Sequence, residues 1–453
     1  MPDARQLALE VLNALDQKKG TLDHVMENLL EKKEELSKKD RSLTHSLVFG
    51  VIRWRNKLDW IIGHYSKTPL KKIDPAVLNI LRLGVFQILY MDRIPDSAAV
   101  NTSVELGKSS GRPWVTRFIN GLLRNVTRHR TDIPFPLMEP DYAKYLSVSC
   151  SFPLWLVEKW LARYTKEETA AMCEAANEIP PITIRTNTLK ITREKLEKAL
   201  EPEVKTIEPT PCSPFGLRLT APKAPISQLE AFQNGWFQVQ DEAAQIVSML
   251  IAPKPGQKIL DACAGLGGKT AHLAQMMNNQ GQIIALDNNS QKLQKLKHEM
   301  NRLGIQIVET CLFDLHHHPG NILSGQLDHV LLDAPCSGLG VIRRNPDIKW
   351  EESKKNLDGY QKRQILFLSN LVDLLKPGGR LTFAVCSTET EETDQVVESF
   401  LNHHPDFQLE DRREALPSTM IPEIYHDSRL TTHPHRDSMD GFFSVCFRKS
   451  GKM

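Results

Sequence analysis

Two cysteines stand where the chain could carry out covalent chemistry. Cys336 follows an Asp-Ala-Pro tripeptide that begins at Asp333, and Cys386 precedes a Ser-Thr pair; each lies at the end of a short apolar run. Open α/β sheets place their chemistry at the carboxyl ends of the strands. A lone cysteine is more often a small buried apolar residue than a nucleophile, but two at predicted strand ends, one of them beside an acid, favour nucleophilic catalysis.

A glycine-rich segment supplies a candidate nucleotide-binding loop. It runs Cys263-Ala264-Gly265-Leu266-Gly267-Gly268-Lys269, between a predicted strand and a helix that we expect to begin near Thr270. Glycines allow a tight turn and let a ligand approach the backbone N–H groups at a helix N-terminus. Asp287 ends the next predicted strand, 20 positions after Gly267, where a carboxylate can accept hydrogen bonds from a ribose. Together they favour a nucleotide-like ligand over a purely structural turn.

The same loop leaves a second interpretation open. Gly268-Lys269-Thr270 is the correct ending of a phosphate-binding P-loop, and the acid strand that ends at Asp333 could then bind the metal of an ATPase. A P-loop, however, requires a glycine at the position that Cys263 occupies. The missing glycine makes the ATPase the minor alternative.

A thiol beside a nucleotide-like cofactor and an acid suits one reaction well. Carbon 5 of cytosine is too unreactive to attack an electrophilic methyl group, whereas addition of a thiolate to carbon 6 makes carbon 5 enamine-like. Methyl transfer from S-adenosylmethionine, loss of the carbon 5 proton and expulsion of the thiol would complete the reaction. Asp333 could stabilise charge near N3 of the base. Chemistry alone does not decide whether Cys336 or Cys386 is the nucleophile.

The sequence around Cys336 resembles that of a known family. Residues 333–338 and 341–350 are similar to the RNA cytosine-5 methyltransferases, and within them to the RsmB (Fmu, or Sun) family, which modifies small-subunit ribosomal RNA. Residues 40–44, 78–84 and 98–101 resemble the family's N-terminal RNA-binding domain, which is similar to the antitermination factor NusB. Residues 235–243 resemble the segment that leads into its catalytic domain. The resemblance covers essentially the whole chain.

The resemblance implies a role for each site residue. The loop from Cys263 to Lys269 would wrap the methionine end of S-adenosylmethionine, Asp287 would hold its ribose, and Asp314 would lie by the adenine. Asp333 would border both cofactor and base. Cys386 would be the nucleophile and Cys336 would serve product release. The substrate would be a specific cytosine of 16S ribosomal RNA, of the type at position 967.

Other positions bear on RNA binding and on the fit to the family. Arg343, Arg344, Lys349 and Trp350 could grip RNA phosphates and stack a base, and the resemblance favours this over a surface helix start. The family usually has proline where this chain has Leu266, and asparagine where it has Thr393. These departures put local loop geometry and hydrogen bonding in question, not the reaction.

The elements that must position these residues change character along the chain. Residues 1–130 show helical periodicity almost throughout, and a proline-containing stretch at 133–140 predicts a linker. Helical periodicity returns at 153–176. Short strands at 182–185 and 216–219, with a helix at 192–200, predict a small α+β insert.

From about residue 240, alternating strands and helices predict a parallel, doubly wound sheet. We expect strands at 258–263, 282–287, 305–310, 329–333 and 380–386. The Pro-Gly-Gly segment at 377–379 predicts a turn that launches the fifth strand. Residues 442–447 alternate in polarity and predict an added strand at the edge of the sheet.

Composition and charge bound the class of protein. The 453 residues carry a net charge of +2, but residues 1–135 hold 22 basic and 15 acidic residues, whereas the remainder holds 35 and 40. A basic N-terminal part suggests an electrostatic partner such as nucleic acid. The eight cysteines show no zinc-ligand spacing, and the run His316-His317-His318 has no partner ligands, so we expect no metal site. Without an apolar leader or membrane span, we expect a cytoplasmic monomer.

Taken together, the patterns and the resemblance predict three parts. They are an all-α NusB-like RNA-binding domain at 1–137, linker helices with a small α+β subdomain at 138–232, and an α/β Rossmann-like class I methyltransferase domain at 233–453. The predicted function is S-adenosylmethionine-dependent methylation of cytosine carbon 5 in 16S ribosomal RNA. A non-catalytic RNA-binding or ribosome-assembly factor is the alternative from another class, and the two intact cysteines argue against it.

Overall fold

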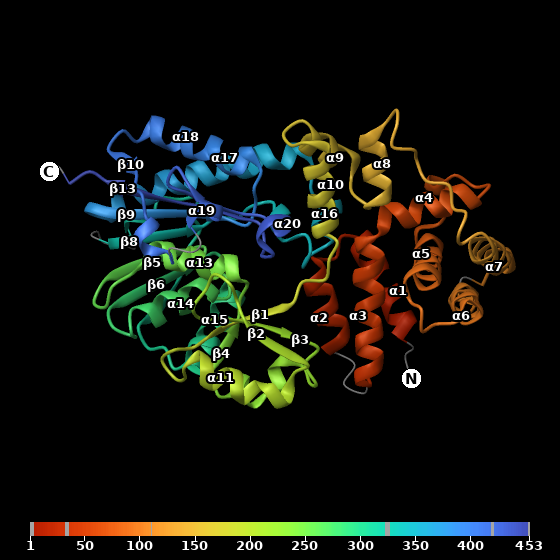
Figure 1. Cartoon of the computed structure of the whole chain (residues 1–453), viewed down its shortest axis with the longest axis horizontal. Coiled ribbons are helices and arrows are strands. Elements are labelled where there is room, and N and C mark those ends of the chain that lie inside the picture. The colour runs from red at the N-terminus through yellow and green to blue at the C-terminus, as the bar shows by residue number, and fades with distance from the viewer. Residues whose placement is uncertain (1–3, 32–35, 110, 322–326, 418–420, 452–453) are drawn as a thin grey trace. The chain divides into compact units, whose positions relative to one another are not determined.

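The computed structural model describes residues 4–31, 36–109, 111–321, 327–417 and 421–451. The chain forms two compact units (Figure 1). The first holds residues 1–177 together with 344–352, and the second holds residues 178–343 and 353–453. The short segment 344–352, although it follows the Cys336 loop, therefore packs with the N-terminal helices.

The described part of the first unit is built from helices. In chain order they are α1 (Ala4–Asp16), α2 (Leu22–Glu31), α3 (Lys38–Arg53), α4 (Arg55–Tyr65), α5 (Pro75–Tyr90), α6 (Asp96–Lys108), α7 (Pro113–Arg128), α8 (Tyr142–Ser149), α9 (Leu154–Leu161), α10 (Lys166–Ala175) and α16 (Ile348–Glu351). This confirms the predicted helical character of residues 1–130.

Helix α5 forms the centre of this unit. Asp74 caps its first turn by accepting the backbone N–H of Ala76, and Pro75 occupies the first helical position, where a missing N–H costs nothing. The helix is apolar on most of its faces, and such a helix must be surrounded by others. A side chain at Gly50 of α3 would collide with the Phe86 ring of α5, so this glycine allows the two helices to pack closely.

The second unit begins with a small antiparallel sheet. Its strands are β1 (Ile182–Thr186), β2 (Thr206–Pro209), β3 (Gly216–Thr220) and β4 (Phe237–Val239), arranged in the order β2-β3-β1-β4. Helix α11 (Arg193–Leu200) contributes the buried side chains of Leu196 and Leu200 to the core of this sheet. The predicted α+β insert is confirmed, with β2 and β4 added.

A nine-stranded sheet forms the rest of the second unit. Its strands are β5 (Lys258–Ala262), β6 (Gln282–Asp287), β7 (Val308–Leu312), β8 (Leu327–Asp333), β9 (Leu375–Val385), β10 (Phe407–Leu409), β11 (Tyr425–His426), β12 (Arg429–Thr432) and β13 (Phe442–Lys449). The order is β11-β12-β13-β9-β8-β5-β6-β7, and β10 pairs with β13. The strands from β9 to β7 are parallel, which confirms the doubly wound prediction.

Helices cover both faces of this sheet (Figure 1). The helices of the second unit that follow α11 are α12 (Glu230–Gln233), α13 (Glu242–Ile251), α14 (Gly268–Met276), α15 (Ser290–Leu303), α17 (Lys354–Leu371), α18 (Asp394–His403), α19 (Ile421–Ile424) and α20 (Pro434–Asp437). Helix α12 packs against the small antiparallel sheet instead. Neighbouring strand residues enter different cores: Ile259 packs with α13, α14 and α15, whereas Leu260 packs with α17 and α18. This alternation explains why each central strand is apolar throughout.

Two details of the sheet differ from the prediction. The last strand, β13, is not at the edge, because β12 pairs with its other side. The Pro-Gly-Gly segment lies within β9 as an irregularity: β8 residues 327 and 329 pair with β9 residues 375 and 380, so the extra residues bulge out. Gly378 takes up the left-handed backbone angle there, with φ of 75°.

Candidate active site

The two candidate thiols meet because their strands are neighbours. β8 and β9 run parallel, with Asp333 opposite Ala384, so the loops that leave their carboxyl ends lie side by side. The Sγ atoms of Cys336 and Cys386 are 3.2 Å apart. The backbone N–H of Gly340 donates to the carbonyl oxygen of Cys386 at 3.0 Å, which ties the first loop to the second.

The contact between the two sulfur atoms affects the pKa of Cys336. The hydrogen bond with Cys386, followed by burial, raises the pKa of Cys336 well above its usual value. Cys336 is therefore protonated at neutral pH, and its S–H can donate to the sulfur of Cys386. The ammonium group of Lys269 interacts electrostatically with the Cys386 side chain.

Glu392 holds the two cysteine loops together. Its carboxylate, buried among the loops, accepts the N–H of Ser337 at 2.8 Å and the hydroxyls of Ser337 and Ser387 at 2.5 and 2.7 Å. Gln364 donates to it at 3.3 Å. Each serine directly follows one of the cysteines, so a single side chain fixes both thiols. Burial raises the pKa of Glu392, and the hydrogen bonds oppose this rise.

The glycine-rich loop has the backbone of a ligand cradle. Cys263, Gly265 and Gly267 have φ angles of 66°, 57° and 84°, which lie in the left-handed region. A Cβ added to Gly265 would meet nothing within 4 Å, so open space borders the backbone there. This supports the expected place of the methionine end of a cofactor, although a non-glycine residue with positive φ, such as Cys263, is uncommon.

Asp287 is oriented by backbone groups on both sides. Oδ2 accepts the N–H of Gly265 at 2.9 Å, and Oδ1 accepts the N–H of Asn289 at 2.8 Å. Each carboxylate oxygen has a second lone pair that could accept a ribose hydroxyl. These contacts fit the cofactor role that the sequence predicts for Asp287.

Asp314 follows β7, at the same edge of the sheet as Asp287, where the parallel strands have their carboxyl ends. The N–H of Phe313 donates to the carbonyl oxygen of Asp287 at 3.1 Å, which brings the two strand ends together. Hydrogen bonds from the backbone and ring of His316 lower the pKa of Asp314 and keep it charged. Asp314 therefore follows directly after a contact with Asp287, and its place beside adenine stays a prediction.

The residues that a P-loop would use for phosphate and metal have protein partners. Lys269 Nζ donates to Asp333 Oδ2 at 2.6 Å, and the hydroxyl of Thr270 donates to Asp261 Oδ2 at 2.6 Å. Burial would lower the pKa of Lys269, but Asp333 raises it overall, so the lysine stays positively charged. Lys269 thus links the cofactor loop to the acid of the Cys336 segment.

Two predicted RNA-binding side chains are structural. Arg343 is 4% exposed and forms ion pairs with Asp440 at 2.6 Å and Asp241 at 3.6 Å. Lys349 is fully buried, and its Nζ donates to Asn177 Oδ1 at 2.6 Å and to the carbonyl oxygen of Ser151 at 3.2 Å. Neither side chain reaches the surface, which corrects the predicted grip on RNA phosphates.

The other two residues of that prediction remain accessible in part. Arg344 and Trp350 are half-buried. The Trp350 indole N–H donates to the carbonyl oxygen of Ile52 at 2.8 Å, and its ring lines a pocket of the first unit. A base-stacking role for Trp350 stays a prediction.

Sequence reasoning missed two residues that organise the site. One is Glu392, for which the paired acids after the Cys386 strand were the only signal. The other is Arg185 of β1, which is buried and has a pKa lowered to about 9 by that burial. Its guanidinium donates to the carbonyl oxygen of Gly268 at 3.0 Å and also to Gln238 and Gln240. The insert thereby supports the start of α14.

No group of three or more His, Cys, Asp or Glu side chains is placed to hold a metal ion in the ranges that the structure describes. Within the same described ranges, no helix is both long enough and apolar enough to cross a bilayer.

The chain is similar to known proteins over nearly its whole length. The model of the family described as 16S rRNA methyltransferase RsmB/F matches residues 248–448, that of the NusB family matches residues 2–128, and that of the RsmF/B-like ferredoxin-like domain matches residues 152–226. The probable ribosomal RNA small subunit methyltransferase B of Bacillus subtilis is 33% identical and is covered over 99% of both chains.

Solved structures show the same fold. The crystal structure of PH0851 is 27% identical, has a TM-score of 0.82 and covers 99% of both chains. NSun6 from Pyrococcus horikoshii, solved with SFG, is 24% identical, has a TM-score of 0.58 and covers 67% of this chain and 99% of its own. The domain boundaries near residues 137 and 232 stay predictions.

Proposed function

Because the chain belongs to the RsmB/F family of 16S rRNA methyltransferases, we propose that it methylates carbon 5 of a specific cytosine, of the position-967 type, through a covalent adduct with Cys386. Methylation of small-subunit ribosomal RNA is the activity of the family, and S-adenosylmethionine is the methyl donor. The observation that carries the finer proposal is the pair of thiols 3.2 Å apart at the ends of adjacent strands. A single structural cysteine would need no such partner.

The chain's own residues fit the cofactor. The loop from Cys263 to Lys269 borders open space at Gly265, and Asp287 and Asp314 present carboxylates at the ends of β6 and β7. Bound there, S-adenosylmethionine would supply an electrophilic methyl group. The residues of the loop would orient it toward the thiol pair, since Lys269 connects the loop to Asp333.

The first step is addition of the Cys386 thiolate to carbon 6 of the base. The S–C6 bond forms as the C5–C6 double bond opens, and carbon 5 gains the electron density to take up a methyl group. Lys269, which interacts electrostatically with Cys386, lies near the attacking sulfur. Asp333, paired with Lys269, borders the base where charge develops at N3.

Release is the step to which Cys336 contributes. Once Cys386 is bonded to carbon 6, its sulfur is a neutral thioether that no longer competes for the proton of Cys336, whose sulfur lies 3.2 Å away. Cys336 can then give its proton to water and, as a thiolate, accept the proton of carbon 5. The C6–S bond breaks, its electrons return to Cys386, and the C5–C6 double bond reforms.

Substitution of each thiol tests this assignment. Cys386→Ala removes the nucleophile and should abolish methylation, with no RNA adduct. Cys336→Ala should still attack and methylate but stall before release, leaving a band on a denaturing gel that requires both RNA and S-adenosylmethionine. Adduct in Cys386→Ala and none in Cys336→Ala would exchange the two roles. Retained activity in both variants, with no adduct, would rule out covalent catalysis.

The non-catalytic alternative is tested separately. A single-turnover assay with labelled S-adenosylmethionine and deproteinised 16S ribosomal RNA should show transfer by the unaltered protein. Transfer to no RNA would favour an assembly factor that retains the fold. Mapping methylcytosine in 16S ribosomal RNA from cells that lack this protein would identify the position.

A further inference from the structure

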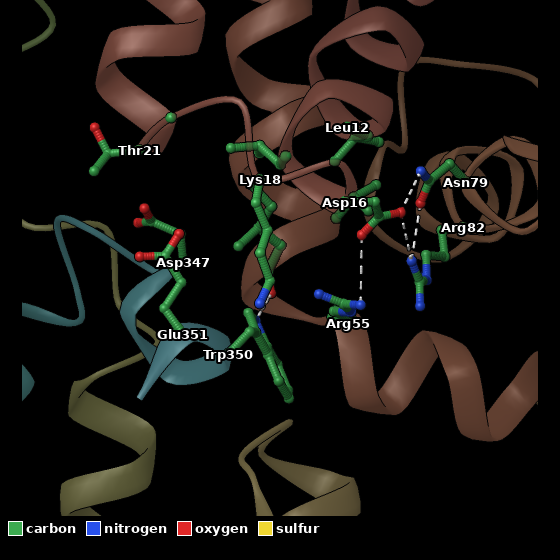
Figure 2. A pocket seen from close by; sticks show the side chains of 14 residues that line it. Leu12, Asp16, Lys18, Thr21, Arg55, Asn79, Arg82, Asp347, Trp350 and Glu351 are labelled. Carbon is green, nitrogen blue, oxygen red and sulfur yellow. Dashed lines mark hydrogen bonds and ion pairs between the residues drawn. The ribbon is translucent and has the colours of Figure 1, made fainter. Parts of the chain in front are cut away.

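A pocket of about 610 Å³ lies within the helical unit, far in sequence from the glycine-rich loop. It is lined by parts of α1, α3, α4 and α5, by the turn before α2, and by the segment 344–352, all of which belong to this unit. Its size falls in the range of about 300–1,000 Å³ that is usual for small-molecule sites. Figure 2 shows its lining side chains.

The walls of the pocket combine apolar and aromatic surface. Leu12 and Leu15 of α1 and Val51 of α3 provide aliphatic side chains. The Trp350 ring lies between the acidic and the basic residues (Figure 2). Its indole N–H is already satisfied by the carbonyl oxygen of Ile52, so the ring is fixed in place. A flat aromatic group held in this way is a surface on which a base can stack.

One side of the pocket carries an acceptor that lacks a donor. Asp347 is 9% exposed, and its Oδ2 accepts the N–H of Leu22 at 3.3 Å. Its Oδ1 is buried and has no hydrogen-bond partner among the described residues. Glu351 stands nearby at the rim, and burial together with repulsion by Asp347 raises its pKa. A buried acceptor without a donor costs stability, so a ligand that donates there would gain free energy.

The other side presents positive charge. Lys18 is exposed where the chain leaves α1. The Arg55 guanidinium lies 5.7 Å from the Trp350 ring centroid, and its ion pair with Asp16 is long, at 3.6 Å. Arg82 is different, because it forms two 2.7 Å hydrogen bonds with Asp59. Lys18 and Arg55 are therefore the cations that can receive an anion in this pocket.

We propose that this pocket binds an unstacked guanine nucleotide of the RNA substrate, with the base against Trp350, its donor edge toward Asp347, and its phosphate toward Lys18 and Arg55. A carboxylate only accepts hydrogen bonds. Guanine places the N1–H and N2–H₂ donors side by side, whereas cytosine and adenine place an acceptor nitrogen beside their amino group and uracil flanks its N–H with two carbonyl oxygens. Only guanine offers adjacent donors to Asp347 and Glu351.

The proposal rests on RNA being the substrate, and it concerns a different site from the thiol pair. Single-stranded RNA is commonly recognised through splayed bases that stack on aromatic rings and pair along their edges. The basic N-terminal part of the chain would then supply both charge and base readout.

Calorimetry on the full chain tests the pocket directly. The titrants are GMP, AMP, CMP, UMP and guanosine, in buffer with a chelator and saturating S-adenosylhomocysteine so that the cofactor loop is filled. GMP should bind more tightly than the other nucleotides. Asp347→Asn should weaken GMP binding about 10- to 100-fold. Lys18→Ala should lower the affinity for GMP to nearly that for guanosine. Lys19 is next in the chain but does not line this pocket, so Lys19→Ala should leave the affinity for GMP unchanged.

Several outcomes would overturn the proposal. Equal binding of all four nucleotides, or loss of GMP binding in Lys19→Ala as in Lys18→Ala, would exclude guanine readout at this pocket. Because Asp347→Asn could loosen the segment, Glu351→Gln provides a second variant, and S-adenosylhomocysteine affinity reports on folding. If the protein methylates cytosine but does not bind GMP, the pocket proposal is wrong and the proposed function stands. If the protein binds GMP but forms no methylcytosine, the proposed function is wrong and the pocket proposal stands.

Discussion

Asp261, at the end of β5, is a buried carboxyl whose ionisation should lower the stability of the catalytic unit. It is 1% exposed; Oδ2 accepts the Thr270 hydroxyl at 2.6 Å, whereas Oδ1 has no hydrogen-bond partner among the described residues. Burial raises its pKa from 3.8 to about 7, against the opposing effect of the Thr270 hydrogen bond. Asn at this position would keep an acceptor for Thr270 and remove the charge.

The sign and size of the effect follow from linkage. A carboxyl with a raised pKa in the folded state favours folding while it is protonated, and this advantage is lost as pH rises from about 4 to 7. The shift corresponds to about 4 kcal/mol above pH 7 and about 1–2 kcal/mol at pH 5. Asp261→Asn should therefore be more stable than the unaltered protein by these amounts.

Scanning calorimetry at several pH values measures this difference. The unfolding transition of the catalytic unit is identified as the one whose Tm rises when S-adenosylhomocysteine is added. For a unit of this size, Asp261→Asn should raise its Tm by about 8 °C at pH 8 and about 3 °C at pH 5. A Tm difference that is absent, or that shrinks as pH rises, would refute the reasoning.

Asp328 of β8 provides a matched control of opposite sign. Burial alone would raise its pKa, but the N–H of Lys258 and the ammonium group of Lys376 lower it overall. Its stabilising contribution is present at neutral pH and is lost as pH falls. Asp328→Asn should lower the Tm at pH 8, with a difference that shrinks toward acid pH.

Two further substitutions test contacts around the thiols and the buried lysine. Glu392→Ala leaves the Ser337 N–H without its acceptor, whereas Gln364 keeps the carbonyl oxygen of Pro335, so the free energy of unfolding should fall by about 3 kcal/mol. The kcat of this variant should fall at least about 10-fold, with S-adenosylhomocysteine affinity retained. Glu392→Gln should do less harm, and equal kcat in Glu392→Ala would exclude the positioning role. Lys349→Ala should destabilise the helical unit by about 3 kcal/mol, which would lower the Tm of the transition that S-adenosylhomocysteine does not shift. The salt dependence of RNA binding should stay unchanged. If RNA binding by Lys349→Ala depended less steeply on salt concentration than binding by the unaltered protein, Lys349 would contact an RNA phosphate after all.

Much of the catalytic unit could be predicted because its signals are local. Each central strand is an apolar run that ends at a chemistry-bearing residue, such as Asp287 or Asp333, and parallel strands deliver those residues to one edge of the sheet. Adjacency of β8 and β9 was not visible in the sequence. The 3.2 Å approach of Cys336 and Cys386 depends on it, and only the fold supplies it.

Long-range partners account for what the sequence did not reveal. Arg343 and Lys349 lie in a segment whose composition suggests a basic surface, but their partners are distant in the chain: Asp440 for the first, Asn177 and Ser151 for the second. The prediction that β13 is an edge strand is wrong for the same reason. The short strand β12 shows little periodicity in the sequence, and it pairs with the side of β13 that was expected to be the edge. No local pattern encodes such contacts.

The burial of these two basic side chains changes where RNA contacts should be sought. The segment 344–352 lies within the residues matched by the methyltransferase family model, yet it packs into the helical unit and contributes Asp347 and Trp350 to the pocket there. Its basic residue Lys349 is used to seat the segment, because three protein oxygens surround the amine. The charge that attracts RNA must then come from elsewhere, and the basic excess of residues 1–135 is the available source. Attraction and base readout would thus be properties of the helical unit, and bond making a property of the thiol pair.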